Sequence, residues 1–516
     1  MIVHQLTAEQ LRAATTRAPL CYVKAGPGSG KTYLATEAFG YLRYERYQRD
    51  SRGVVGVTFA RSARSELEFR IRQRWSPRAL AWPNAICTFD ELHRQLLRYL
   101  VVHGHIEWPS GAFPAQVDDT WQDHPGSTGK PGARARYALT LDREGRVSTM
   151  ATSSDSAAPK PCFTDSWKLL GAIEGGYCTH AEVRNVLRAA LDSTAHPTLS
   201  AAASTCLGRS YCHLIVDESF DMNTLDALVV ERAIEAGVTV TLVGDPWQSL
   251  YEFRGASPDR VHDLLKKRRF HKIDMPGARR YITGEMRTLA QCLFDEVPFQ
   301  VSVGQNGDEF DVVLAHDWTT LWDERRIAVL PIGRPSGLDG SELANCFVLL
   351  LNEVVRSYFG RDAAGVVEAR RKLGVDTAEV RIQGALELLR NGSAGIDEVW
   401  AALQREFQPP GAKWAAKGKR ATDYMLRLRE LSVLGESPVL GLTIHQSKGL
   451  EWDRVLLLNG ELTTDPALRN QLRQQYESHR SVYVGLTRAR STLRVLPVAP
   501  NRHSKNPPTP IPWVRR

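Results

Sequence analysis

The sequence predicts an α/β fold with two parallel sheets, each interrupted by an insertion. Short apolar runs alternate with amphipathic stretches at the start of the chain, where residues 20–24 and 53–59 are expected to be buried strands followed by helices. The same pattern returns further along, in the runs 212–216, 238–244, 439–444 and 454–459. Strands that alternate with helices are typical of parallel sheets.

The length and the changes in composition set the expected domain boundaries. A chain of 516 residues is long enough for about three or four folded units. Residues 109–161 are rich in Gly, Pro, Ser and Asp, which favours loops or poor order. The expected division is a first sheet domain at 1–98 and 206–270 around a partly disordered insertion at 99–205, a second at 271–342 and 435–500 around a reduced helical insertion at 343–434, and a flexible tail at 501–516.

Charge and cysteine content indicate the kind of partner and the compartment. The net charge of +8 favours a polyanionic partner, nucleic acid first, although a solvated basic surface gives the same value. Eight cysteines without a CxxC pair favour buried free thiols in a reducing cytoplasm over a metal site at Cys178 and His180 or at Cys212 and His213. The sequence has no signal-peptide pattern and no apolar stretch long enough for a bilayer, so we expect a cytoplasmic protein without a membrane partner.

A phosphate-binding loop is predicted where the first strand ends. Glycines let backbone N–H groups converge on phosphates, and the N-terminus of the following helix adds positive potential. Lys31 is expected to reach the β- and γ-phosphates, and the Thr32 hydroxyl to hold Mg²⁺. A glycine-rich turn without a ligand is the alternative, which the Lys-Thr pair disfavours. The loop consists of Ala25, Gly26, Pro27, Gly28, Ser29, Gly30, Lys31 and Thr32.

Two carboxylates follow the apolar run at 214–216. Asp217 stands at the C-terminal end of a predicted strand, where a carboxylate can coordinate Mg²⁺. Glu218 is placed to orient an attacking water as a base. Such a pair is weak evidence alone, but together with the phosphate-binding loop it indicates hydrolysis of a nucleoside triphosphate.

Five further blocks give the sequence a family resemblance. In chain order they resemble motifs Ia, Ib, III, V and VI of superfamily 1 helicases of the UvrD/Rep type, and Gln10 matches the Q motif of that family. The resemblance implies two RecA-like domains with P-loop NTPase topology, and an enzyme that hydrolyses ATP to move on DNA. It does not cover the insertions. The blocks are TFARSARSELEFRI (58–71), CTFDEL (87–92), GDPWQSLYEFRGA (244–256), TIHQSKGLEW (443–452) and YVGLTRAR (483–490).

The resemblance implies how charge is placed around the γ-phosphate. A loose transition state needs positive charge and an aligned water there. Lys31 and Mg²⁺ would supply part of the charge, Arg488 resembles an arginine finger, and Arg280 resembles a second one. A surface salt bridge is the alternative for each arginine. Because the arginines and Lys31 belong to different domains, the resemblance implies that ATP closes a cleft and hydrolysis reopens it.

The remaining nucleotide contacts also follow from the resemblance. Gln248 resembles the γ-phosphate sensor, Glu451 the residue that binds the ribose hydroxyl, and Gln10 the adenine reader. Family members hold adenine between an Arg after the phosphate loop and a Tyr before the Arg of motif IV, the motif to which Arg280 corresponds. Tyr33 and Arg279 occupy those places in exchanged order, and stacking between a ring and a guanidinium survives the exchange.

A DNA track is implied as well. Single strands are held by backbone contacts and aromatic stacking. Trp247 is as compatible with core packing as with DNA contact, and Arg61, Arg64 and Arg70 either extend the track or form a solvated helix face. The family moves 3′ to 5′, so the expected partner is single-stranded DNA or DNA with a 3′ single-stranded tail. The candidate contacts are Thr58, Phe59, Thr88, Phe253, Arg254 and His445.

The sequence departs from the family in three further places. Residues 217–221 stand at the place of the family's motif II. Phe220 replaces an amide side chain of that motif, which can alter coupling to DNA. Asp90 stands where motif Ib has a histidine, which weakens DNA contact or requires a basic neighbour. The insertion at 343–434 is much shorter than the family's 2B domain, which argues against robust unwinding by the chain alone.

Several functions fit these motifs. The leading expectation is an ATP-dependent 3′–5′ translocase or helicase on single-stranded DNA. The second is a nucleotide-dependent switch that binds DNA and regulates a partner nuclease, and an RNA helicase is third because the motif set is of the DNA type. The compact size also resembles the helicase subunit of Gabija-like anti-phage systems. A nuclease or another DNA-processing protein is therefore a candidate partner, in DNA repair or in antiviral defence.

Overall fold

The protein forms two compact units, Met1–Gly277 and Ala278–Arg516, which are described one at a time. Both contain a parallel sheet, so the expected α/β class is confirmed. This computed structural model describes residues 6–117, 136–152, 163, 165–250, 252, 255–276, 280–305, 308–316, 320–321, 327–329, 341–354, 369–370, 373, 381–407, 419–433, 439–462, 465 and 468–496.

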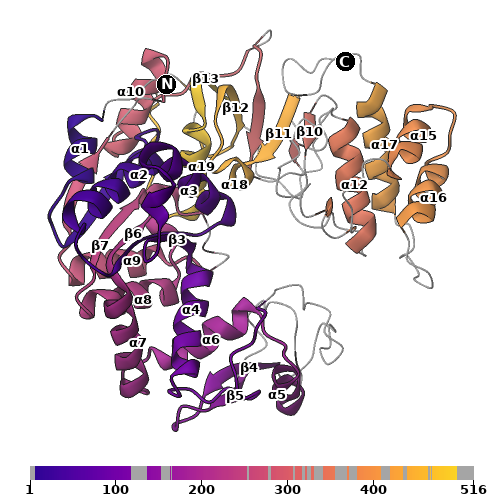
Figure 1. The fold of residues 1–516 in the computed structure, drawn as a ribbon. Helices are drawn as coiled ribbons and strands as arrows, with labels where there is room; N and C mark the ends of the chain where they lie inside the picture. The colour runs from indigo at the N-terminus through magenta and orange to yellow at the C-terminus, as the bar shows by residue number, and fades with distance from the viewer. Residues whose placement is uncertain are drawn as a thin grey trace. The chain divides into compact units, whose positions relative to one another are not determined.

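A six-stranded sheet forms the centre of the first unit (Figure 1). All neighbouring strands are parallel, in the order β3-β2-β6-β7-β1-β8. Strands β6, β7 and β1 are therefore adjacent although they are far apart in the sequence. The strands are β1 (Leu20–Ala25), β2 (Gly53–Thr58), β3 (Ala85–Thr88), β6 (Tyr211–Val216), β7 (Thr239–Gly244) and β8 (His271–Met275).

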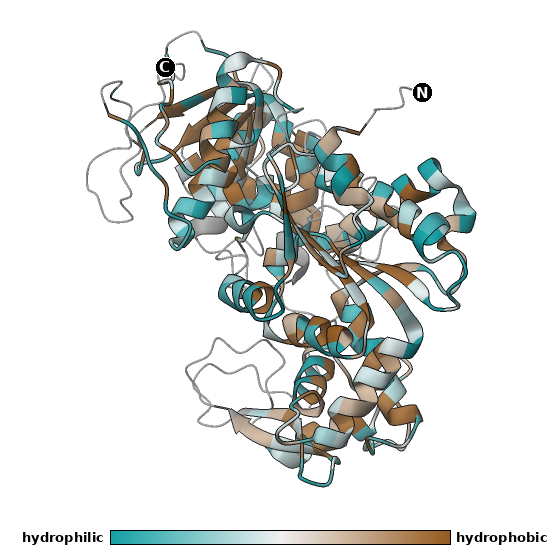
Figure 2. Ribbon diagram, turned by 90° about the vertical axis from the view of Figure 1, so that its left-hand side faces the viewer, coloured by the Kyte–Doolittle hydropathy of each residue, from teal (hydrophilic) through white to brown (hydrophobic). Residues whose placement is uncertain are grey.

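Helices cover both faces of this sheet, because alternate strand residues enter two different cores. Cys21 and Val23 pack with helices from the start of the chain, whereas Tyr22 packs with helices from the insertion and beyond. Figure 2 shows mostly hydrophobic strands and helices of mixed hydropathy. The first core takes residues from α1 (Ala8–Ala14), α2 (Lys31–Tyr41), η1 (Leu42–Arg46), α3 (Arg61–Trp75) and η2 (Pro77–Leu80); the second from α4 (Phe89–Val102), α5 (Ser166–Glu174), α6 (His180–Ala190), α7 (Pro197–Ser210), η4 (Ser219–Asp221), α8 (Thr224–Glu235) and α9 (Pro258–Lys267).

A hairpin lies within the stretch expected to be loops. Strands β4 (Arg136–Leu141) and β5 (Val147–Thr152) pair in antiparallel fashion, so the expectation is wrong for these residues. Leu139 is buried in the core, and the Asp142 carboxylate accepts hydrogen bonds from the backbone of Glu144 and Arg146 in the turn. The stretch therefore combines turn chemistry with a buried apolar contact, and average composition conceals the second.

The second unit combines a sheet with a separate group of helices. Its five-stranded parallel sheet has the order β10-β11-β9-β12-β13, and the helical group has a core of its own that contains Trp400. No helix in the described part of the chain is long and apolar enough to cross a membrane. The strands are β9 (Val312–Ala315), β10 (Ile327–Val329), β11 (Val439–Thr443), β12 (Trp452–Leu458) and β13 (Ala489–Leu496); the helices are α10 (Gly284–Phe294), α12 (Ser341–Val354), α15 (Gln383–Arg390), α16 (Ile396–Phe407), α17 (Lys419–Val433), α18 (Ile444–Ser447) and α19 (Glu477–Leu486).

Candidate nucleotide-binding site

The phosphate-binding loop joins the end of β1 to the start of α2. Gly28 and Gly30 have φ values of 71° and 82°, which glycine adopts without strain. The Gly26 amide donates to the carbonyl of Met275 at 3.1 Å, which fixes the loop to the neighbouring strand β8. No described side chain caps the N-terminus of α2. Its first amides are therefore those that bind an anion in other proteins.

Three neighbouring strands bring the main predicted residues together. Lys31 follows β1, Glu218 follows β6 and Gln248 follows β7. The Lys31 ammonium donates to Gln248 Oε1 at 3.1 Å and lies 3.7 Å from Glu218 Oε1. Gln248 Nε2 in turn donates to Asp245 Oδ2 at 2.9 Å. The first unit therefore contains a connected group of one cation, one amide and two carboxylates at the carboxyl edge of the sheet.

Asp217 is a buried carboxyl beside this group. Burial raises the pKa of Asp217, the Glu218 carboxylate raises it further, and Lys31 opposes both effects. A divalent cation stabilises the ionised form of such a carboxyl, so Asp217 is chemically suited to hold Mg²⁺. No cluster of three or more His, Cys, Asp or Glu side chains suited to a metal occurs in the described ranges.

Glu218 has an unusual backbone conformation. Its φ of 53° and ψ of 43° lie in the left-handed region, which a non-glycine residue rarely adopts. Strain of this kind is concentrated at functional sites. The conformation was not predictable from the sequence, because a glutamate gives no signal for a positive φ.

Gln10 is fixed against the phosphate-binding loop. It is buried, and its Nε2 donates to the Ser29 carbonyl at 2.8 Å. Its Oε1 accepts the Thr7 amide in the capping box of α1. Tyr33 lies in the first turn of α2, whereas Arg279, its expected partner, lies outside the described residues.

The predicted DNA contacts of the first unit follow the same edge of the sheet. Thr58 ends β2, Thr88 ends β3, and both are buried. The Thr88 hydroxyl caps α4, so it already accepts the amide of Glu91. Phe59 packs on Phe89 with ring centroids 5.1 Å apart. Phe253 and Arg254 lie outside the described residues.

The structure bears on three residues for which the sequence left two roles open, namely Trp247, Arg64 and Arg70. Trp247 is 2% exposed, which favours core packing over DNA contact. Arg64 pairs with Glu68 and Glu91, and Arg70 pairs with Glu66 at 2.6 Å, as residues of a solvated helix face do. The side chain of Arg61 lies outside the described residues.

The two departures in motifs Ib and II also have local explanations. Asp90 Oδ1 accepts a hydrogen bond from Arg184 at 2.7 Å, so the basic neighbour that it requires is present. Phe220 is buried against Tyr22 and His262, with ring centroids 5.8 Å and 5.0 Å away. The motif II substitution thus exchanges an amide for an aromatic packing contact.

Comparison with known proteins identifies the family. The family described as AAA domain matches residues 9–254, and the UvrD-like helicase C-terminal domain matches residues 425–497. The chain belongs to the superfamily 1 helicases of the UvrD/Rep type. The ATP-dependent DNA helicase Rep of Escherichia coli (strain K12) is 27% identical over 253 residues, which cover 47% of this chain and 36% of Rep. The chain thus matches little more than a third of the length of this relative.

The second unit contains Arg280 and Arg488, the two arginines that the resemblance predicts near the γ-phosphate. Arg280 NH2 lies 2.6 Å from Glu451 Oε1, and Arg280 NH1 donates to the Thr487 carbonyl at 3.3 Å. Arg488 is buried, and its guanidinium donates to the Val484 carbonyl and the Thr487 hydroxyl. The structure therefore brings Arg280, Glu451 and Arg488 together around Thr487. The resemblance assigned both arginines to the γ-phosphate and Glu451 to the ribose.

His445, the remaining predicted DNA contact of the family, lies in the short helix α18. It is partly buried, and its ring centroid is 6.1 Å from that of His316.

The sequence did not predict the roles of two residues, Asp245 and Arg184. Asp245 holds Gln248, and its Oδ1 also accepts the Trp247 amide. An aspartate directly before proline is an N-cap signal, so this role could have been predicted from the sequence. Arg184 gave no such signal, because its contact with Asp90 joins the insertion to α4 across 94 residues.

Proposed function

We propose that the protein is an ATP-dependent 3′–5′ translocase or helicase on single-stranded DNA that hydrolyses ATP to ADP and phosphate. The main support is the contact of Lys31 with both Gln248 and Glu218 at the ends of three neighbouring strands. This arrangement combines a phosphate-binding cation, a base and an amide that can respond to the γ-phosphate.

The proposed reaction is attack of water on the γ-phosphorus of ATP. The new bond joins the water oxygen to phosphorus, and the bond from phosphorus to the β,γ-bridging oxygen breaks. Glu218 orients the water and accepts its proton, and Lys31 stabilises the charge on the β- and γ-oxygens. Arg280 and Arg488 are assigned the family's role of adding positive charge there.

Nucleotide recognition and metal binding complete the proposed site. We assign adenine contact to Gln10, Tyr33 and Arg279, and ribose contact to Glu451. When bound, Mg²⁺ would neutralise charge on the phosphate oxygens, and Thr32 and Asp217 would hold it.

Motif III is proposed to couple hydrolysis to DNA. Gln248 contacts Lys31, and Ser249 next to it donates to the Phe220 carbonyl of motif II at 2.9 Å. A change at the γ-phosphate would therefore be transmitted to the segment that leads to Phe253 and Arg254. We propose that these residues, with Thr58, Phe59, Thr88 and His445, contact the DNA strand.

Steady-state ATP hydrolysis with and without oligo-dT tests this function. We expect strong stimulation by oligo-dT in the wild-type protein and no turnover above background in Lys31→Ala and Glu218→Gln. Glu218→Gln should still bind ATP, whereas Lys31→Ala should bind it weakly. An unstimulated wild-type enzyme would contradict the motor, and equal turnover in Glu218→Gln would contradict the assigned base.

A second function is favoured by the buried Phe220. Its packing against Tyr22 and His262 replaces an amide with a contact that cannot donate a hydrogen bond. A nucleotide-dependent switch that regulates a partner nuclease, in repair or in antiviral defence, would need binding of ATP but little movement. ATP-dependent DNA binding without displacement of streptavidin from either end of a biotinylated strand would favour the switch. Displacement from the 5′ end alone would favour the 3′–5′ motor.

We also propose the domain division given by the sequence, with the first sheet domain interrupted at 99–205 and the second at 343–434. The helices α12, α15, α16 and α17 of the second insertion share one core, which supports a separate small domain.

A further inference from the structure

A cluster of basic side chains lies at the amino-terminal edge of the six-stranded sheet. Residues 266–272 read Lys-Lys-Arg-Arg-Phe-His-Lys and run from the end of α9 into the start of β8. Helices α7, α8 and α9 all end where strands β6, β7 and β8 begin. This edge is therefore opposite the one that carries Lys31, Glu218 and Gln248.

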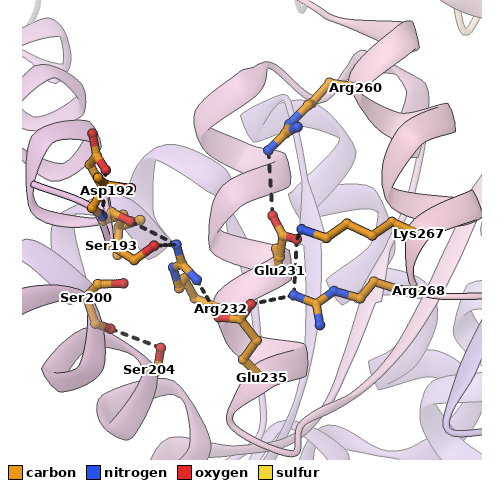
Figure 3. Close-up of polar contacts among 12 residues, drawn as sticks. Asp192, Ser193, Ser200, Ser204, Glu231, Arg232, Glu235, Arg260, Lys267 and Arg268 are labelled. Carbon is orange, nitrogen blue, oxygen red and sulfur yellow. Dashed lines mark hydrogen bonds and ion pairs between the residues drawn. The ribbon is translucent and has the colours of Figure 1, made fainter. Parts of the chain in front are cut away.

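One buried carboxylate organises this cluster (Figure 3). Glu231 in α8 accepts Lys267 Nζ at 2.6 Å and Arg268 NH2 at 3.1 Å, and Arg260 NH2 lies 3.6 Å away. Burial alone would raise the pKa of Glu231, but the hydrogen bonds from Lys267 and Arg268 outweigh burial and lower it. The carboxylate is therefore ionised at neutral pH. It fixes three cations whose remaining N–H groups can still donate, since ammonium and guanidinium have several donors.

A second carboxylate extends the cluster toward the insertion. Glu235 pairs with Arg268 and with Arg232, and Arg232 also donates to the Leu191 carbonyl and the Ser193 hydroxyl (Figure 3). The four cations and two carboxylates leave an excess of two positive charges. Because the cations are held in place, little side-chain entropy remains to be lost when an anion binds.

Two more cations stand beside the cluster. Lys266 and Arg269 are exposed, and neither has an ion pair with any residue the structure describes. Arg269 has a φ of 53°, the left-handed region that glycine or asparagine normally occupies after a helix. Helices α4, α5 and α8 of the same unit have Gly104, Gly176 and Gly237 with positive φ at this place. An arginine is less stable here than glycine, which points to a use for its charge.

We propose that this basic edge, formed by Arg260, Lys266, Lys267, Arg268 and Arg269, contacts the phosphate backbone of double-stranded DNA. The inference rests on the proposed DNA function and adds a second surface to it. It would hold the duplex part of a substrate while the carboxyl edge of the sheet holds the single strand.

Duplex DNA fits this surface better than single strands do. Duplex DNA presents about one negative charge per 1.7 Å of its axis, which suits closely spaced fixed cations. Single strands need aromatic platforms for stacking. The aromatic residue of the run, Phe270, is partly buried and packs against the core.

Binding of a blunt duplex of about 20 base pairs and of oligo-dT of about 15 nucleotides, each over a range of salt, tests the proposal. The variant is Lys266→Gln with Arg269→Asn. It removes two charges without breaking an ion pair, and asparagine suits the left-handed conformation, so the thermal stability should not fall. The matched control is Arg98→Gln with Arg188→Gln, which removes two exposed charges from α4 and α6.

We expect the slope of log affinity against log salt for the duplex to become shallower by about 2 in the variant, and not in the control. Between about 50 and about 200 mM salt the wild type should lose about tenfold more duplex affinity than the variant. Oligo-dT affinity and the ATPase rate that it stimulates should be unchanged.

An unchanged duplex slope in the variant would overturn the proposal. Displacement of the duplex by poly-glutamate at equal charge would also overturn it, because it would indicate an acidic protein as the partner. If the wild type did not bind oligo-dT at all, the proposed function itself would be contradicted. The two failures can therefore be told apart.

Discussion

His213 should make the stability of the first unit fall at acidic pH. It lies in β6, where its ring nitrogens are 2.6 Å and 3.0 Å from the hydroxyls of Thr239 and Thr241. Burial lowers the pKa of His213 from 6.5 to about 3, with a further contribution from Arg46. The folded protein therefore binds this proton less tightly than the unfolded chain does. The resulting stability is present above pH 6.5 and is lost as the pH falls toward 3.

The size of this effect follows from the two pKa values. With 6.5 in the unfolded chain and about 3 in the folded one, lowering the pH from 7 to 5 removes about 2 kcal/mol. For a unit of this size that corresponds to a fall in Tm of about 4 to 8 °C. The assay is thermal unfolding by circular dichroism at a series of pH values, for the wild type and for His213→Gln, which keeps hydrogen-bonding groups but does not titrate.

Other groups also titrate in this range, so the test compares the Tm of the wild type with that of His213→Gln at each pH. We expect Tm to fall more steeply with acid in the wild type than in His213→Gln. Parallel curves for the two proteins would refute the assignment of the acid sensitivity to this histidine.

Three further outcomes follow from single contacts. Asp245→Ala removes the acceptor of Gln248 and should lower the kcat of ATP hydrolysis by about tenfold or more with nucleotide affinity retained; an unchanged kcat would show that Gln248 needs no such support. Arg184→Ala leaves Asp90 unneutralised and should weaken oligo-dT binding, which adding Asp90→Asn should restore. The free energy of unfolding should change by less than about 1 kcal/mol, because the ion pair is partly exposed. Gly40→Ala should lower Tm, because a Cβ there would overlap the Trp75 ring and overpacking costs about 1 to 3 kcal/mol, more than alanine gains in a helix; an increase in Tm would mean that Trp75 moves easily.

The sequence predicts best what depends on local pattern. The loop from Gly26 to Thr32 could be placed because its glycines, its lysine and its position after a strand are local features. The two parallel sheets could be predicted for the same reason, since their strands are short apolar runs. The hairpin at β4 and β5 was missed because turn residues around Asp142 dominate the composition of a stretch whose buried contacts are few.

Contacts between distant segments could not be predicted. The ion pair of Arg280 with Glu451 joins two parts of the second unit that are separated by the helical insertion. Neither residue is unusual in its own surroundings, so no local signal indicates the pair. The same holds for Glu231, whose three basic partners come from α9 and the residue after it. Such contacts are set by strand order, which short-range patterns do not encode.

Strand order also explains why one site is assembled from three distant motifs. In the sheet, β1 lies beside β7, and β7 beside β6, with the strands parallel. Every carboxyl end therefore lies at the same edge, and Lys31, Gln248 and Glu218 follow three adjacent strands. Lys31 contacts both of the others, so an anion that takes up the lysine must compete with the amide and the carboxylate together. In the proposed function, this competition would link phosphate binding to motif III through Gln248.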